Sequence, residues 1–291
     1  MRNVSTLIAA AVVLAGFSPA LQAQWPPHPL PNVPRTADSK PNLNATAPRA
    51  TDGKPDLSGV WETAPCVGCA PPDITGLGPP PAQGRPPGSG GTPPASGFVF
   101  GNIGAGLPGG APYQPWAADL VKKRMADNSK DNPDAHCLPM GIMQLDSHPY
   151  PKKIIQTPSE VIIIYEGSGT TVREVYLDGR SLPGKNAEPW WNGYSIGRWE
   201  GDTLVVETSG FMDDGWLDVR GSPLTSAGKL TERFRRLNYG YLEIAVTIDD
   251  PKAYTKPFTA MVYNRIMPDT QLIEFVCIDK DAAHYVGARD K

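Results

Sequence analysis

The second half of the chain consists of short segments in which apolar and polar residues alternate. The clearest alternation runs over residues 241–249, where Leu242, Ile244, Val246 and Ile248 are interleaved with Tyr241, Glu243, Ala245 and Thr247. Successive side chains of a strand point to opposite faces, so this period of two predicts a strand with one buried face. Residues 161–164 are instead continuously apolar, as expected of a strand covered on both sides. The pattern from Lys153 onward is therefore that of β structure.

Turn signals divide this region into strands. Further strands are predicted at residues 57–62, 153–157, 160–166, 171–177, 195–199, 203–209, 229–237, 258–267 and 271–278. Taken together, these segments predict roughly eight to ten antiparallel strands, joined mostly by tight turns. Closing such a sheet removes its exposed edges. We therefore expect an all-β fold, either a lipocalin-like (calycin-like) barrel or a strongly curved meander sheet.

Two segments depart from the β pattern. Residues 115–128 predict one short helix, because Pro115 suits a first helical turn and Lys122, Lys123 and Arg124 lie toward its C-terminal end. Residues 70–112 are rich in Pro and Gly, a composition that buries too little apolar area to offset its ordering entropy. The predicted organisation is a signal peptide (1–23), an extended arm (24–56), a first strand with a Cys-x-x-Cys motif (57–69), a Pro/Gly-rich insertion (70–112), a barrel domain with an N-terminal helix (113–284) and a tail (285–291).

The N-terminus has the pattern of a secretory signal peptide. Arg2 precedes an apolar run over residues 7–17, and small residues follow as far as Ala23. The apolar run is too short to span a bilayer comfortably, and no later segment is apolar enough to do so. We therefore expect cleavage near Ala23 and a periplasmic or secreted mature chain without a transmembrane segment.

The four cysteines of an exported chain suggest two disulfides. We expect Cys66 and Cys69, which are close in sequence, to form a short-loop disulfide, and Cys137 to pair with Cys277. A metal or redox site is the alternative for Cys66 and Cys69. Residue 70 is Ala rather than His, which excludes a haem-attachment motif, and no second Cys-x-x-Cys completes a four-thiolate zinc site.

Composition and motifs narrow the function classes. The net charge is −3, so no basic surface indicates nucleic acid or an anionic membrane as a partner. The chain contains no His-Glu-x-x-His motif, which leaves a zinc protease site unsupported. We expect no cofactor and no metal.

Several segments resemble a widespread family of bacterial exported, β-rich proteins to which no function is assigned. They cover most of residues 52–280 outside the Pro/Gly tract, at residues 52–61, 137–139, 154–158, 176–180, 193–208, 231–234 and 247–251. The resemblance implies no catalytic residues. Residues 223–226 read Pro-Leu-Thr-Ser where the family tends to have Pro-His-Ser, so no role of that histidine is carried over. Gly59-Val60-Trp61 is also similar to the Gly-x-Trp that starts lipocalin barrels, although a buried Trp in any β-sandwich is the alternative.

The region after residue 176 is dense in aromatic and charged side chains. We interpret it as a barrel mouth that binds a ligand through the residues Asp178, Arg180, Trp190, Trp191, Tyr194, Trp199, Trp216 and Asp218. Small-molecule pockets have this mixture of aromatic walls and a few polar anchors. The alternative is purely structural, with Asp178 and Gly179 at a hairpin tip and Arg180 exposed.

Three residues are candidates for acid/base chemistry. His148 lies two residues after Asp146, so that His148 could act as a general base oriented by the carboxylate. The alternative is a loop histidine bonded to the backbone. Glu232 shares a strand face with Arg236, and a buried Glu–Arg pair inside a barrel would be costly and functional. The alternative is a solvated outer face, and Glu207 and Glu166 are similar candidates for an interior carboxylate.

Three hypotheses for the function follow. The first is an exported β-barrel that binds a hydrophobic or aromatic small molecule. The second is an acid/base enzyme, an isomerase, lyase or hydrolase, that acts on such a molecule inside the barrel. The third is a structural or interaction module of the cell envelope. The first two predict a cavity and the third a filled interior, and no oligomeric state is predicted.

Overall fold

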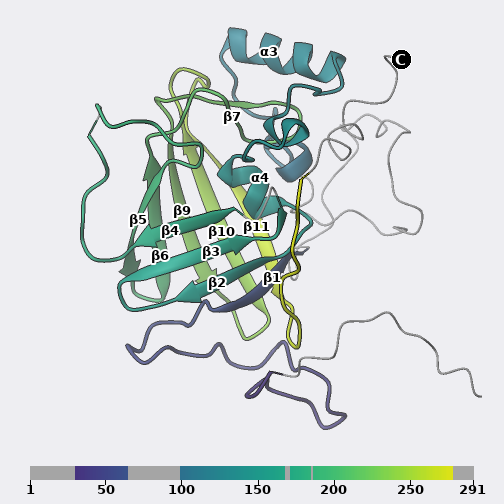
Figure 1. The fold of residues 1–291 in the computed structure, drawn as a ribbon, viewed down its shortest axis with the longest axis vertical. Coiled ribbons are helices and arrows are strands. Elements are labelled where there is room, and N and C mark those ends of the chain that lie inside the picture. Colours follow the sequence, from purple (N-terminus) through teal and green to yellow (C-terminus); the bar gives the residue numbers. More distant parts are fainter. Residues whose placement is uncertain (1–29, 65–98, 168–170, 185, 278–291) are drawn as a thin grey trace, which may run out of the picture.

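The computed structural model describes residues 30–64, 99–167, 171–184 and 186–277. In this part of the chain nine strands form a closed barrel, in the order β1-β11-β10-β9-β6-β5-β4-β3-β2 (Figure 1). The strands are β1 (Gly59–Thr63), β2 (Lys152–Gln156), β3 (Glu160–Tyr165), β4 (Val172–Tyr176), β5 (Tyr194–Glu200), β6 (Thr203–Ser209), β9 (Lys229–Arg236), β10 (Tyr241–Asp249) and β11 (Phe258–Ile266). The expected all-β barrel is confirmed.

One pair of neighbouring strands departs from the antiparallel pattern. β4 and β5 run parallel and pair only at Val175–Ser195 and Tyr176–Ile196. Parallel neighbours require a connection that returns to the starting end of the sheet, and residues 177–193 make this crossover. Asp178 and Gly179 therefore begin a long connection rather than the tip of a hairpin. Because the register is so short, β4 and β5 are not paired through their backbones before Val175.

The strand expected at residues 271–278 is absent from the described residues 271–277. The physical reason is that β1 lies between β11 and β2, so that no free edge remains for a further strand. The segment is instead held by side chains. Ile273 donates its N–H to the Glu166 carboxylate at 3.0 Å, and Cys277 forms the expected disulfide with Cys137.

Helices cover one end of the barrel, where α4 lies over the opening and α3 lies farther out (Figure 1). The helix predicted at 115–128 is α3 (Pro115–Ala126), which is followed by a short 3-10 helix η1 (Pro133–His136). The sequence did not indicate α4 (Ile142–Ser147), because all of its residues are buried and no amphipathic period marks it. Among the described residues, no helix is long and apolar enough to cross a membrane.

The ends of the barrel are covered by other parts of the chain. Residues 99–112, from the Pro/Gly-rich segment, pack near α4 with Val99 and Ile103 buried. The N-terminal arm runs along the opposite end (Figure 1), where the N–H of Gly240 donates to Leu43 at 2.8 Å. A second small sheet pairs β7 (Gly215–Trp216) with β8 (Pro223–Leu224).

Apolar side chains from most strands fill the barrel interior. They include Trp61, Ile154, Ile163, Val175, Leu204, Val206, Phe234, Ile244 and Val262, each no more than 1% exposed. The alternation expected over 229–237 and 241–249 is confirmed, since every second residue of β9 and β10 is buried. The end of the interior beneath α4 contains charged side chains instead.

Candidate functional site

Four charged side chains form a buried ionic cluster, which we define as Asp146, Lys152, Arg173 and Glu232. They come from α4, β2, β4 and β9, and each is at most 4% exposed. Lys152 donates to Asp146 Oδ1 at 2.9 Å, and Arg173 forms an ion pair with Glu232. Two acids and two bases make the cluster formally neutral, which offsets part of the cost of burying charge.

Arg173 is the best-bonded member of the cluster. Its Nη1 and Nη2 donate to the two carboxylate oxygens of Glu232, the first at 3.0 Å. Its Nε donates to Ser195 Oγ at 3.1 Å, and Nη2 also donates to Thr208 Oγ1 at 2.9 Å. Burial would lower the pKa of Arg173, but the Glu232 carboxylate outweighs it and raises the pKa. Such two-pronged pairing fixes both charge and orientation.

The two carboxylates of the cluster have different environments. Asp146 Oδ1 also accepts from the Tyr165 hydroxyl at 3.0 Å, whereas Oδ2 is buried without a hydrogen-bond partner and lies 3.8 Å from Arg173 Nη1. Burial raises the pKa of Glu232 even beside Arg173. At Asp146 burial is outweighed by Lys152 and Arg173, which lower the pKa. Divergent pKa values of this kind are typical of acid/base pairs, and also of structural ion networks.

His148 lies apart from this cluster. Its Nδ1 accepts from the N–H of Tyr150 at 3.0 Å, and its ring lies 4.9 Å from that of Phe100 and 4.6 Å from that of Tyr150. The Asp146 carboxylate points instead to Lys152 and Tyr165. The pairing of His148 with Asp146 as a base and its orienting group is therefore not formed, and the backbone-bonded alternative describes His148.

Stability is expected to fall in mild acid because of His148. Burial lowers its pKa to about 4, from a usual value near 6.5. Because the pKa of His148 is lower in the folded state than in the unfolded state, protonation of His148 favours unfolding. The free energy of unfolding is therefore unaffected by His148 above pH 6.5 and falls by about 3 kcal/mol as the pH drops toward 4. Urea unfolding between pH 7 and pH 4.5 measures this loss. The His148→Asn variant keeps an acceptor for the N–H of Tyr150, and its free energy of unfolding should fall less over this pH range. An equal fall in both proteins would show that His148 does not cause the loss of stability.

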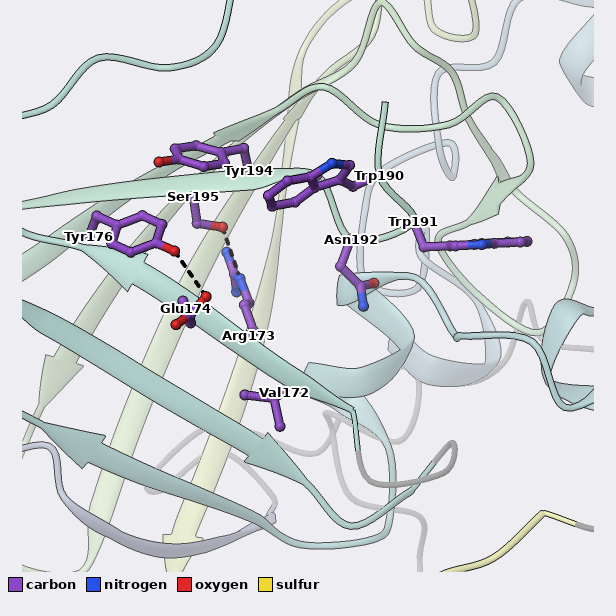
Figure 2. Close-up of a pocket in the computed structure, with 10 residues that line it drawn as sticks. Val172, Arg173, Glu174, Tyr176, Trp190, Trp191, Asn192, Tyr194 and Ser195 are labelled. Carbon is purple, nitrogen blue, oxygen red and sulfur yellow. Dashed lines mark hydrogen bonds between the residues drawn. The ribbon is translucent and has the colours of Figure 1, made fainter. Parts of the chain in front are cut away.

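A pocket lies at the short pairing of β4 and β5 in the barrel wall, and we call it the wall pocket. Its volume is about 230 Å³, and it is lined by Val172, Arg173, Glu174, Tyr176, Trp190, Trp191, Asn192, Gly193, Tyr194 and Ser195 (Figure 2). Arg173 and Ser195 belong to the lining and are also bonded to each other in the barrel interior. The wall pocket therefore reaches the buried ionic cluster through Arg173.

Aromatic rings form one side of the wall pocket. Tyr176 and Tyr194 stack with centroids 5.3 Å apart, and the Trp190 ring lies 5.5 Å from that of Tyr194. Trp190 is 54% exposed, so much of its indole is open to a ligand. The indole of Trp191 points away from this group (Figure 2), so Trp191 does not extend the aromatic surface.

The backbone holds Trp190 in place at the pocket. Its N–H donates to Gly210 at 2.9 Å, and its carbonyl accepts from Met212 at 3.0 Å. Gly193 has φ +61°, and a side chain there would lie 2.8 Å from the Phe211 ring. Glycine is thus required where the crossover turns into β5.

Asp178 and Arg180 lie at the edge of the wall pocket. The Arg180 guanidinium carbon is 3.8 Å from the centre of the Tyr176 ring, and Nη1 donates to the Tyr194 hydroxyl at 2.9 Å. Arg180 also pairs with Asp178 through Nε at 2.9 Å. Arg180, held by Asp178, therefore contacts both tyrosines at the edge of the pocket.

The other predicted ligand residues are not brought to this pocket. Trp216 is buried under Arg124, whose guanidinium carbon lies 4.2 Å from its ring centre. Asp218 is buried and accepts from the N–H of Ile103 at 2.6 Å and of Ser222 at 3.0 Å, so that it organises a loop. Trp199 pairs with Leu204 near the far end of β5. The expected ring of eight residues is therefore wrong as one site.

The residues predicted as charged groups of the barrel interior also lie in different places. Glu232 is buried as proposed, but its partner is Arg173; Arg236 donates from Nε to the carbonyl of Asn238 at 3.1 Å. Glu207 lies outside, paired with Lys229 at 2.6 Å. Glu166 is buried and binds the backbone of the C-terminal segment.

Several site residues were missed at the sequence level, namely Lys152, Tyr165, Arg173, Glu174, Tyr176 and Asn192. A signal for Arg173 was present, since the period of two places it on the same inward face as Val175. An inward arginine requires a buried carboxylate, which points to Glu232. No such signal marks Asn192, which lies in the crossover.

In comparisons with known proteins, no protein-family model matches the chain, and neither a curated protein nor a solved structure matches it. Among the described residues, no group of three or more His, Cys, Asp or Glu side chains could hold a metal ion. The predicted pair Cys66 and Cys69 lies outside the described residues.

Proposed function

We propose that this protein binds a small molecule with an aromatic or hydrophobic ring in the wall pocket. The observation that carries the proposal is the exposed face of Trp190, next to the stacked Tyr176 and Tyr194, over a gap in the barrel wall. A ring whose backbone is already fixed offers contact area to a ligand and loses little conformational entropy when the ligand binds. With about 230 Å³, the pocket suits a ligand smaller than a drug molecule.

Replacement of Trp190 by alanine is expected to weaken binding by about 1–2 kcal/mol, because the ring contact is lost. Ligand-observed NMR with a library of one-ring and two-ring compounds would measure this. Trp116→Ala is the matched control, since Trp116 is 46% exposed on α3 and does not line the pocket. If the compounds bound Trp190→Ala as tightly as Trp116→Ala, the wall pocket would not be the binding site.

Acid/base catalysis on the bound molecule is a second candidate, because Arg173 connects the pocket to Glu232 and Asp146. Neither carboxylate lines the pocket, and four of the five N–H groups of Arg173 are bonded to Glu232, Ser195 and Thr208. A proton would therefore have to pass Arg173 to reach a ligand. This separation favours binding over catalysis as the primary function.

We also propose that the protein works outside the cytoplasm, as a member of the exported family that its motifs resemble. The disulfide between Cys137 and Cys277 supports this location, because such bonds persist in oxidising compartments. Expression of the full chain in a bacterial host should yield a periplasmic or secreted protein whose N-terminus lies near Gln24. An unprocessed chain that stays in the cytoplasm would contradict export.

A further inference from the structure

We infer that the ligand of the wall pocket carries an ammonium group beside its ring. This inference rests on the proposed function and adds the chemical class of the ligand. Two charged side chains line the pocket. Arg173 is bonded within the protein, which leaves the Glu174 carboxylate as the charge offered to a ligand.

Arg173 is the cation of the lining, and its charge is not available to a ligand. Its fork is bonded to Glu232, Ser195 and Thr208, and Ser195 Oγ also shares a hydrogen bond of 2.9 Å with Thr208. A ligand carboxylate would have to displace Glu232 from a fully buried pair. The desolvated Glu232 left behind would make this costly.

Two acceptors lie beside the aromatic rings, and of these Glu174 is exposed. Asn192 Oδ1 is buried and has no hydrogen-bond partner, which costs free energy unless a donor is supplied. Glu174 accepts from the Tyr176 hydroxyl at 2.9 Å, and no ion pair to Glu174 is formed within the described residues. Figure 2 shows Glu174 next to Tyr176, with Trp190 and Asn192 across the opening. A donor that enters beside the rings would meet the Glu174 carboxylate.

The ring faces favour a cationic donor over a neutral one. The faces of Trp and Tyr rings are electronegative and attract ammonium groups, more strongly where water is excluded. The pocket already has an example at its edge, where Arg180 lies over Tyr176 with 3.8 Å between the guanidinium carbon and the ring centre. The exposed ring of Trp190 and the Glu174 carboxylate beside Tyr176 are the elements of an ammonium site.

Three probes with one ring and a short side chain test this inference by calorimetry: 2-phenylethylamine, 2-phenylethanol and phenylacetate. We expect the amine to bind about tenfold more tightly than the alcohol and phenylacetate to bind most weakly. Glu174→Gln should remove most of the preference for the amine. Glu243→Gln, which removes a carboxylate paired with Arg235 on another strand, should leave it unchanged.

The outcomes separate this inference from the proposed function. Equal binding of the amine and the alcohol, or tighter binding of phenylacetate, would overturn the ammonium group while leaving a ring-binding pocket. Failure of all three probes to bind would overturn both. Asn192→Asp gives an independent readout: a negative charge added to the lining should tighten binding of the amine several-fold, and weaker binding of the amine would contradict an ammonium group in the pocket.

Discussion

Replacing Glu232 by alanine is expected to lower the free energy of unfolding by about 3–5 kcal/mol. The reason is that Arg173 would stay buried at 4% exposure after losing its two-pronged partner. The remaining carboxylate of the cluster, Asp146, is 3.8 Å from Arg173 and already accepts from Lys152. Urea unfolding under oxidising conditions measures the change directly.

A double variant separates this explanation from a simple packing loss. Replacing both members of the pair, with Arg173→Met and Glu232→Leu, removes the two charges together and should recover much of the stability. Ser195 and Thr208 would retain their mutual hydrogen bond of 2.9 Å. Two results would contradict this explanation. One is a Glu232→Ala variant as stable as the wild type, and the other is a double variant less stable than Glu232→Ala.

Loss of the disulfide between Cys137 and Cys277 is expected to cost about 4–5 kcal/mol. The bond joins residues 140 positions apart, and the chain-entropy model gives long loops the largest effect. In the folded protein it also fixes the segment that carries Ile273 and Phe275, whose ring lies 5.7 Å from that of Tyr150.

The comparison for this prediction is between wild type and the variant with Cys137→Ser and Cys277→Ser. The urea midpoint should fall in the variant, and a reductant should lower the wild-type midpoint toward it. A native protein in which thiol titration finds Cys137 and Cys277 free, with an unchanged midpoint in reductant, would contradict the prediction.

The barrel could be predicted because its strands carry a local signal. Over 229–237 and 241–249 the period of two matches the burial of β9 and β10 residue by residue. The parallel pair of β4 and β5 could not be predicted, since the Asp178-Gly179 signal describes a turn and not the path of the chain over residues 180–193. That unpredicted crossover creates the wall pocket.

The site was only partly predictable for a related reason. Trp190, Tyr194 and Glu232 were identified because aromatic and ionisable residues are conspicuous in a strand-rich region. Their partners come from distant segments, and Arg173 rather than Arg236 pairs with Glu232 because it faces the interior at the α4 end. Helix α4, which supplies Asp146, has no period that marks it as an element.

The most direct test of the ligand site is a crystal structure of the protein soaked with small aromatic compounds that are cationic, neutral and anionic. We expect electron density for a ring against Trp190, between β4 and β5, with a polar group toward Glu174. The Arg173–Glu232 pair should stay intact beneath the ligand. A wall pocket without ligand in crystals that bind the same compounds elsewhere would contradict the central claim.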